Sequence, residues 1–142
     1  MVVINFNQIL RLPLFYKGDL AAYASVCADA IRLNPDEQQL DLVNYSTAPA
    51  IKIARLAVDK HFVGYGFGKF LIEYIRYTCQ VLNELLGIRY VTLDAFPHRT
   101  NYYKKLGFRE NLVYSADKRR KFISMRSDYQ DGEMEESEET VG

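Results

Sequence analysis

The chain has 142 residues, of which 49% are hydrophobic and 13% aromatic, so we expect one folded domain with a substantial core. No apolar run reaches the about 18 residues that a membrane-spanning helix needs, which excludes that class of membrane protein. The formal net charge of zero conceals an asymmetry, because six of the 18 acidic residues stand in residues 131–142. Residues 1–130 carry the other 12 acids and all 18 bases, a net charge of +6 that suits an anionic ligand.

The two ends of the chain suggest its boundaries and compartment. Residues 131–142, DGEMEESEETVG, are almost without apolar side chains, so we expect a disordered acidic tail after a single domain of residues 1–130. The amino terminus has neither a basic leader nor a small-residue cleavage site, which favours a cytoplasmic protein. Cys27 and Cys79 stand in apolar segments, which favours buried free thiols over a disulfide.

The first third of the chain predicts two strands and a helix start. Strands are expected at 12–16 and 20–33, joined by the hairpin-turn sequence Lys17-Gly18-Asp19. The alanines of the second segment would equally allow a helix, but the turn favours a strand. Asn34 then has the side chain of an N-cap, followed by Pro35 at the first helical position and Glu37 as its capping-box partner, so a short helix is expected.

The middle of the chain predicts a strand, a glycine loop and a long helix. A polar loop at 44–49 precedes the strand expected at 51–58, and the alternation of this strand breaks at Leu56-Ala57-Val58, which predicts a bulge or splay there. The helix is expected over 69–86 and ends at Gly87, in the favoured C′ position. Its core-facing stripe consists of Ile72, Ile75, Cys79, Leu82 and Leu86, joined by Leu71 and Leu85.

The last third predicts a strand at 89–96, which Pro97 stops, and a short helix at 98–106. Two more strands are expected at 108–113 and 121–129, with a basic loop at 118–121 between them. The order of elements is that of a single mixed α/β domain.

Glycine occupies every second position between the 51–58 strand and the long helix, at Gly64, Gly66 and Gly68. Glycines at a strand-to-helix turn let the backbone approach a ligand closely, and the first helical amides favour an anion. A dinucleotide fingerprint is excluded, because its sixth position would be Lys69 or Leu71 instead of glycine. A P-loop is excluded as well, because Val63 and Phe70 occupy required positions.

Two motifs resemble those of the GNAT family of N-acetyltransferases. In that family a Leu-Ala-Val-like strand end precedes Arg/Gln-x-x-Gly-x-Gly/Ala and a long helix, as do 56–58 and 63–68 here. The sequence YYKKLGF at 102–108 resembles the family's aromatic-Tyr-x-x-Leu-Gly-Phe signature after the next strand. The resemblance covers residues 21–113 and implies the mixed α+β sheet of an acyl-CoA N-acyltransferase.

The resemblance implies an enzyme that moves the acetyl group of acetyl-CoA directly to a primary amine, with no metal. The tetrahedral intermediate would form near the Val58 amide, an oxyanion donor. Tyr103 would be the general acid that protonates the sulfur of coenzyme A, with Tyr102 as its packed neighbour. The residues that would bind the cofactor are Leu56, Ala57, Val58, Val63, Gly64, Tyr65, Gly66, Phe67, Gly68 and Lys69.

The other chemically active side chains have weaker support. Tyr103 itself has the alternative of a packing role, because the chain contains 11 tyrosines. Glu73 and Asp94 are candidate general bases by position only, so no base is assigned. His61 and His98 are expected on the surface, and no ligand spacing supports a metal site.

The sequence departs from the family pattern in two places. Val63 replaces the usual arginine or glutamine at the head of the loop, from which we expect a weaker or altered pyrophosphate contact. Only Met1 to Leu10 stands before the predicted strand pair, where family members have a strand and one or two helices that form part of the acceptor site. We therefore expect an amino-terminally shortened version, with an acceptor site that is more open or completed by a partner.

Within the family, the segments ARLAVD and GIRYVTLDA look most like compact bacterial members. Several of these are toxins that acetylate aminoacyl-tRNA and are blocked by an antitoxin. The expected partners are therefore a small-molecule or aminoacyl amine, with tRNA and an antitoxin-like protein in the toxin version. An exposed edge strand in so short a version favours a homodimer. The alternative to an active enzyme is a CoA-binding module of low activity that a partner completes.

Overall fold

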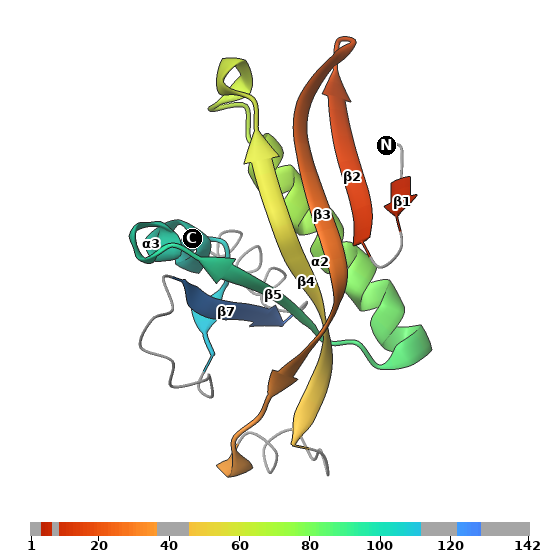
Figure 1. Ribbon diagram of the computed structural model, residues 1–142, viewed down its shortest axis with the longest axis vertical. Helices are drawn as coiled ribbons and strands as arrows, with labels where there is room; N and C mark the ends of the chain where they lie inside the picture. Colours follow the sequence, from red (N-terminus) through yellow and green to blue (C-terminus); the bar gives the residue numbers. More distant parts are fainter. Residues whose placement is uncertain (1–3, 7–8, 37–45, 112–121, 129–142) are drawn as a thin grey trace, which may run out of the picture.

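The computed structural model describes residues 4–6, 9–36, 46–111 and 122–128. The elements are β1 (Ile4–Phe6), β2 (Ile9–Tyr16), β3 (Asp19–Arg32), β4 (Thr47–Val58), η1 (Lys60–Phe62), α2 (Phe67–Leu86), β5 (Tyr90–Ala95), η2 (Pro97–Arg99), α3 (Thr100–Lys105), β6 (Arg109–Glu110) and β7 (Ile123–Asp128). They form a seven-stranded sheet in the order β1-β2-β3-β4-β5-β7-β6 (Figure 1). Among the described strands, β4 and β5 alone pair in parallel, so the predicted mixed sheet is confirmed.

The predicted hairpin is present, with β2 and β3 joined by the two-residue turn Lys17-Gly18. Both residues have positive φ, 49° and 86°, a turn geometry that matches the twist of antiparallel strands. The segment that could have been a helix is the 14-residue strand β3, whose Ala22, Ala24 and Val26 alternate into the core. The short strand β1, which the sequence did not predict, pairs with β2.

Strand β4 begins at Thr47, four residues earlier than expected, and its bulge lies elsewhere than predicted. Ser25 of β3 pairs with Arg55 and Val26 pairs with Ile53, so Ala54 is the extra residue. The prediction of a bulge at 56–58 was therefore wrong in position. Since one extra residue reverses the alternation, Leu56 and Val58 face the same core as Ile53, which explains the broken pattern in the sequence.

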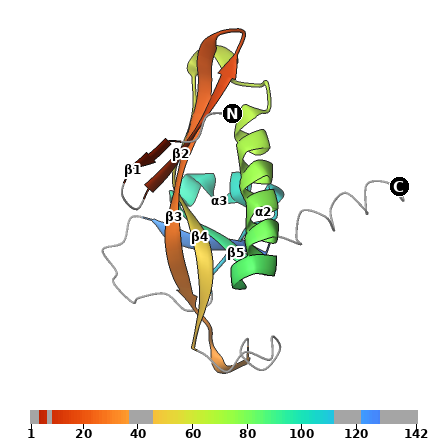
Figure 2. The ribbon, with the colours of Figure 1, turned by 90° about the vertical axis from the view of Figure 1, so that its right-hand side faces the viewer.

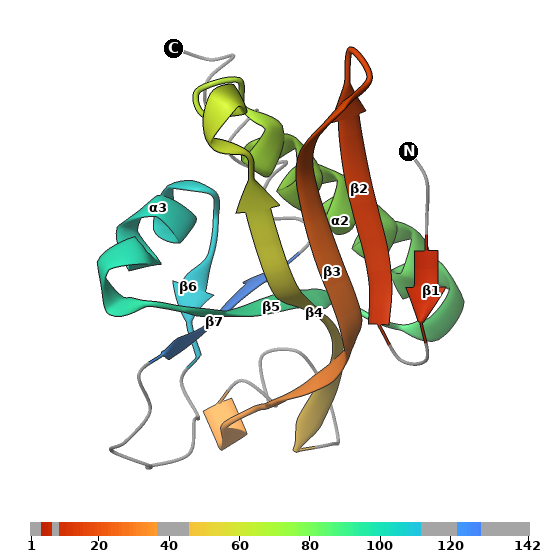
Figure 3. The same ribbon diagram turned by 45° about the horizontal axis from the view of Figure 1, so that its top comes forward.

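The predicted splay is confirmed at the same end of β4. The parallel pairing of β4 with β5 covers only Ala50–Ile53 and Tyr90–Leu93. Beyond these residues the two strands diverge, as Figures 1 and 3 show. The last residues of β4 are therefore paired with β3 but have no β5 neighbour in the described sheet.

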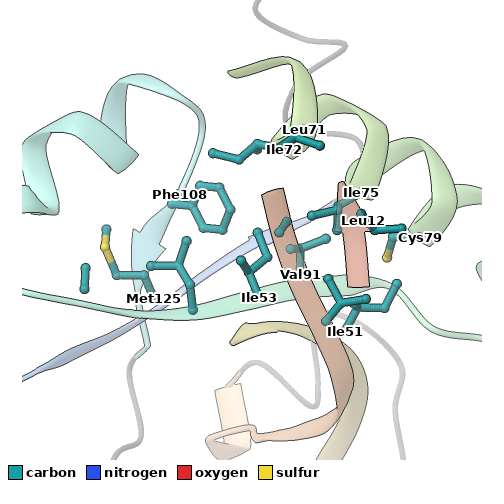
Figure 4. Packing of buried hydrophobic residues seen from close by; sticks show 14 of the residues in the cluster. Leu12, Ile51, Ile53, Leu71, Ile72, Ile75, Cys79, Val91, Phe108 and Met125 are labelled. Atoms are coloured by element: carbon teal, nitrogen blue, oxygen red, sulfur yellow. The ribbon is translucent and has the colours of Figure 1, made fainter. Parts of the chain in front are cut away.

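Helix α2 packs on one face of the sheet (Figure 2). Leu71, Ile72, Ile75 and Cys79 are almost fully buried against β3, β4 and β5 (Figure 4). At the far end of the helix the predicted stripe fails, because Leu85 and Leu86 are 72% and 70% exposed. Helix α2 begins two residues before the predicted start and ends as expected, with the amide of Gly87 donating to the Asn83 carbonyl at 2.9 Å. We call the sheet face away from α2 the far face.

The C-terminal part differs from prediction mainly at element boundaries. Pro97 opens the turn η2, which runs into α3, so the helix predicted at 98–106 is divided in two. Strand β6 spans only Arg109–Glu110, so Phe108 and Asn111 lie outside the strand, and positions 112–113 lie outside the described residues. Strand β7 begins at Ile123, later than expected, and the predicted end at 129 lies outside the described residues.

Three predictions lie wholly or mostly outside the described residues: the short helix after Asn34, of which only Pro35 and Asp36 are described and helical, the basic loop 118–121 and the acidic tail 131–142. Both cysteines are free thiols as predicted, with Cys79 buried and Cys27 half-buried. Among the described helices, none is long and apolar enough to cross a bilayer.

Candidate functional site

A cleft of about 500 Å³ lies beside the splayed end of β4. Three segments line it: the end of β4, the glycine loop with the start of α2, and the η2–α3 segment. The lining residues are Leu56, Val58, Phe62, Val63, Gly64, Gly66, Phe67, Gly68, Lys69, Arg99, Tyr102, Tyr103 and Leu106. The structure thus brings together most of the residues that the sequence singled out. Ala57 and Tyr65 are the two predicted cofactor residues that do not line the cleft.

The hydrogen-bond phase of β4 determines which backbone groups face the cleft. The amide of Asp59 donates to the Ala21 carbonyl at 2.8 Å. In an antiparallel ladder, hydrogen-bonded pairs of residues alternate with pairs that exchange no hydrogen bonds. Because Asp59 and Ala21 are bonded to each other, the next pair, Val58 and Ala22, exchanges no hydrogen bonds, and the same holds for Leu56 two residues earlier. The N–H and C=O groups of Leu56 and Val58 therefore point away from β3, toward the gap left by β5. They form a short free strand edge that an extended, amide-containing ligand could extend.

The glycine loop presents the start of α2 to the same cleft. Gly64 and Gly66 have φ of 92° and 80°, left-handed values that side chains rarely adopt. Gly66 is the N-cap residue of α2 and has no side chain to cap it, so the first amides of the helix keep their capacity to bind an anion. At Gly68 the reason for glycine is lack of space instead of backbone conformation. A Cβ there would lie 3.3 Å from the Tyr102 hydroxyl and 3.5 Å from Val58 Cγ2.

Four aromatic rings hold the glycine loop against the tip of the β2–β3 hairpin. Tyr16, Phe62, Tyr65 and Phe67 form a mutual cluster in which all six ring-centroid distances lie between 5.3 and 6.0 Å. Tyr65 therefore supports the loop instead of lining the cleft. The role of Tyr16 could not be predicted from a local pattern, because Tyr16 stands 46 residues before Phe62 in the chain.

The charges of the cleft are one-sided. Lys69 and Arg99 are its charged lining residues, and no acidic residue is among the lining set. The Arg99 guanidinium lies 5.9 Å from the centre of the Tyr102 ring. Cations beside uncapped helical amides suit a phosphate-bearing ligand. Arg99 was not predicted from the sequence, and Tyr102 was expected only as a packing residue, although their positions close to Tyr103 on one short helical segment could have indicated a place in the cleft.

Tyr103 is half-buried at the cleft, and its ring packs edge-on to Tyr102 and Phe108. Burial raises the pKa of its hydroxyl above the ordinary value of 10.0, so the hydroxyl is protonated and able to donate at neutral pH. Tyr102 was expected to be the packed neighbour, but it is the more exposed of the two at 41%. The reason is the direction of α3, which turns Tyr103 toward the core and Tyr102 toward the start of α2.

A buried arginine joins the two helical walls of the cleft. Arg76 of α2 is 3% exposed and donates hydrogen bonds to the Leu106 carbonyl, to Ser127 Oγ at 3.1 Å and to Glu73 Oε1 at 3.3 Å. Its guanidinium also lies 5.1 Å from the centre of the Phe108 ring. These contacts fix the turn that follows Tyr103 against α2. Glu73, a candidate base by position, lies beside this arginine and does not line the cleft.

The remaining candidates lie outside the cleft. Asp94 accepts a hydrogen bond from Lys52 at 2.9 Å, and this bond raises the pKa of Lys52. His61 and His98 are exposed as predicted. Asp59 accepts from the backbone N–H and the ring of His61, which lowers the pKa of Asp59. The described residues contain no group of three or more His, Cys, Asp or Glu side chains placed to hold a metal ion.

A family model described as an acetyltransferase (GNAT) domain matches residues 21–110. A comparison with curated protein sequences gives no significant match.

Several solved structures share the fold at low sequence identity. A bacterial toxin is 21% identical with a TM-score of 0.65, covering 84% of this chain and 66% of that one. AtaT complexed with acetyl-methionyl-tRNAfMet is 17% identical with a TM-score of 0.72, covering 89% and 74%. A mutant AtaT toxin bound to the C-terminus of the antitoxin AtaR and acetyl-CoA is 16% identical with a TM-score of 0.61, covering 83% and 64%. The chain thus spans about two thirds to three quarters of the length of these structures.

Proposed function

Because the chain belongs to the GNAT family of acetyltransferases, we propose that it transfers the acetyl group of acetyl-CoA to a primary amine in the cleft beside β4. Family membership confirms the resemblance seen in the sequence, the acyl-CoA N-acyltransferase fold and the class of N-acetyltransferase that uses acetyl-CoA. The roles of individual residues, the acceptor and the partners are the proposal.

The observation that carries the proposal is the free backbone edge of Leu56 and Val58 beside the uncapped start of α2. The pantetheine arm of coenzyme A has two amides, which Leu56 and Val58 would bond as a neighbouring strand would. Its pyrophosphate would accept hydrogen bonds from the amides of residues 63–69, next to the charge of Lys69. Val63 has no polar side chain to add, so Lys69 and Arg99 supply the side-chain charge there.

In the reaction, the neutral amine attacks the thioester carbon and the Val58 amide donates to the developing oxyanion. The carbon–sulfur bond then breaks, and Tyr103 donates its phenolic proton to the leaving sulfur. The nitrogen loses its extra proton to water, and the Tyr103 phenolate takes up a proton from water for the next turnover. The raised pKa of Tyr103 keeps that proton in place, so any loss of kcat caused by its ionisation should occur only above pH 10.0.

Calorimetry with acetyl-CoA, combined with a thiol-release assay over a panel of primary amines, tests the enzyme proposal. Micromolar or tighter binding with release of coenzyme A is expected, as is coenzyme A in the mass spectrum of the purified protein. Tight binding without turnover on any amine, including aminoacyl-tRNA, would instead favour the binding-module alternative.

A Tyr103→Phe variant tests the assignment of the general acid. We expect kcat to fall about 100-fold, with the Kd for acetyl-CoA unchanged, because only the transferable proton is lost. The matched control is Tyr77→Phe, a 63% exposed tyrosine on α2 that should leave both values unchanged. Full turnover by Tyr103→Phe, with binding retained, would refute the assignment.

A second, narrower candidate is the amino group of aminoacyl-tRNA as the acceptor, with an antitoxin-like protein as the inhibitor. The observation that favours it is the likeness to AtaT structures described with acetylated tRNA and with the antitoxin AtaR. The net charge of +6 on residues 1–130 supports an anionic acceptor. If aminoacyl-tRNA is the acceptor, the protein belongs in a bacterial cytoplasm. The proposal also includes a homodimer formed through an exposed edge of the sheet.

Expression of this chain, with and without the product of the neighbouring gene, tests this candidate. We expect growth arrest when the chain is expressed alone and acetylated aminoacyl-tRNA in the extracted RNA. The absence of both would remove the tRNA candidate and leave a small amine as the acceptor.

A further inference from the structure

An exposed aromatic group lies where β5 passes into η2. Phe96 and Phe122 are 50% and 45% exposed, and their ring centres are 4.8 Å apart. The His98 ring stacks on Phe96 at 5.6 Å, with an angle of only 20° between the planes. Side chains of this size rarely remain in contact with water as a group unless they bind something. Neither the cofactor cleft nor the core uses these three rings, which we call the aromatic platform.

The strand register places the platform on the far face of the sheet. Ala95 pairs with Ile123, and both pack toward the core under α2. Their chain neighbours Phe96 and Phe122 therefore face the opposite side. The register therefore places the platform at the end of β5, on the side of the sheet away from α2. Figure 2 shows that α2 covers the other side.

The platform is nevertheless close to the cleft along the chain. The Arg99 amide donates to the Phe96 carbonyl at 2.8 Å, which ties the platform to η2, and Arg99 itself lines the cleft. A ligand that stacks on Phe96 would thus lie one short helical turn from the residues that border the cleft. An acceptor that reaches the thioester through the splay from the far face has to pass the platform.

The charges near the platform favour a polyanion. Arg55 is exposed and, after the bulge at Ala54, falls on the far face of β4. Asp94 and Asp29 also belong to the far face. Lys52 offsets the charge of Asp94 at 2.9 Å, and Asp29 accepts a hydrogen bond from Thr92 at 2.7 Å. Arg109 is exposed as well, and it pairs with Arg126, which lies on the same face of β7 as Phe122. Flat exposed rings interleaved with cations are the combination that binds single-stranded nucleic acid, since every base has a π-face and every nucleotide a phosphate.

We infer that Phe96, His98 and Phe122 stack the unpaired terminal base of an RNA acceptor. The inference rests on the proposed aminoacyl-tRNA acceptor and adds the place where its end is held. The 3′-terminal nucleotide of such an RNA carries the aminoacyl ester, so stacking of its base on the platform would bring the amine to the splay. The phosphates behind it would lie among the cations of the far face. A small free amine has no part that needs the platform.

Fluorescence anisotropy with two labelled RNA minihelices tests the inference, one with a single-stranded 3′ overhang and one blunt-ended, at a fixed salt concentration. Phe96→Ala and Phe122→Ala should each bind the overhang RNA about tenfold more weakly, with the blunt RNA unchanged. The control Tyr77→Ala removes a 63% exposed ring on α2 and should change neither. Acetyl-CoA binding and turnover on a small primary amine should be unaffected in all three variants.

Further variants and outcomes make the test decisive. Phe96→Leu keeps the apolar volume but removes the flat ring, so it should lose about as much overhang binding as Phe96→Ala and guards against a folding defect. Wild-type binding by Phe96→Leu, or an equal loss on blunt RNA, would overturn the inference. If the wild-type protein acetylates small amines but binds neither RNA, the inference fails while the acetyltransferase proposal stands.

Discussion

The two faces of the sheet around the β4–β5 splay are built very differently. On the α2 side the cleft is fixed by buried polar bonds of Arg76, by an aromatic cluster and by left-handed glycines. On the far face the contacts beside the splay include a half-exposed Lys52–Asp94 ion pair, a hydrogen bond of 2.7 Å from the buried Thr92 hydroxyl to Asp29, and the exposed rings of the platform. The buried bonds and packed rings around the cleft suit a ligand of constant shape, such as the proposed acetyl-CoA. The other side keeps a surface that fits a large acceptor.

The difference teaches that the parts of a two-substrate site need not be equally preorganised. The atoms of the cofactor are the same in every turnover, so rigid placement of its amides and phosphates lowers the entropy cost each time. A large acceptor brings its own rigid shape and many contacts. A few stacking rings and charges then suffice to orient its reactive end.

Loss of the buried arginine should have the largest effect on the α2 side. Arg76→Met leaves the Leu106 carbonyl and Ser127 without their donor, and we expect the free energy of unfolding to fall by about 3 kcal/mol. Denaturant unfolding monitored by circular dichroism measures this. Arg55→Met on the far face, which removes an exposed arginine, should stay within about 0.5 kcal/mol of wild type. Equal losses in the two variants would contradict the contrast between the faces.

A distorted glycine loop should act on affinity. Gly66→Val places a β-branched residue at φ 80°, where strain of about 1–2 kcal/mol is expected. If the loop relaxes to avoid that strain, its amides leave the anion position, so calorimetry should show acetyl-CoA bound about tenfold more weakly. Gly66→Asn is the control, because asparagine tolerates the left-handed region. The same Kd for acetyl-CoA in both variants would show that the conformation of the loop does not contribute to binding.

Removal of the hairpin's contact with the loop should have a smaller and more selective effect. Tyr16→Ala deletes one ring of the four-ring cluster, and ring pairs contribute about 0.5–1.5 kcal/mol each. We expect about fivefold weaker binding of coenzyme A, with no change for acetyl-pantetheine, which lacks the pyrophosphate. Phe15→Ala, next in the chain and 56% exposed, serves as the control. An equal loss for both ligands would indicate general damage instead of loop support.

The smallest effect should be a difference in thiol reactivity between the faces. Burial raises the pKa of Cys79, on the buried face of α2, to about 12, so this thiol should be inert at pH 8. Cys27 is half-buried and pairs across β3 and β4 with Lys52 of the far face. A thiol-reactive aromatic disulfide should therefore modify one thiol per native chain and two in denaturant, and none in native Cys27→Ser. Rapid modification of Cys79 in the native protein would show that the α2 side opens.

The parts of the molecule that the sequence predicted are those with a local signal. The glycine loop, the α2 stripe and the Lys17-Gly18 turn each depend on residues within a few positions of one another. The position of the bulge could not be read in the same way, because it depends on which β3 residue pairs with each β4 residue. Leu86 was misplaced because periodicity does not reveal where the sheet ends beneath the helix.

The residues of the candidate site that belong to sequence motifs were predicted, but the distant residues that support them were not. Val58, the glycines and Tyr103 came from motifs, whereas the support for them comes from distant residues. Arg76 bonds to Ser127, 51 residues away, and Tyr16 packs on a loop that begins 46 residues later. No local pattern distinguishes such a residue from an ordinary arginine or tyrosine. The platform was missed for the same reason, because Phe96 and Phe122 meet only through the pairing of β5 with β7.

The bulge at Ala54 changes the side of β4 that every following residue faces. Because of this one extra residue, the side chains of Leu56 and Val58 face the core, and their backbone N–H and C=O groups point away from β3. Without it, both would point to the opposite sides. Deletion of Ala54 would leave every later residue of β4 in the chain, yet present the wrong half of the backbone to the gap. The length of this strand, counted residue by residue, is therefore as much a part of the ligand-binding edge as the identity of the residues in it.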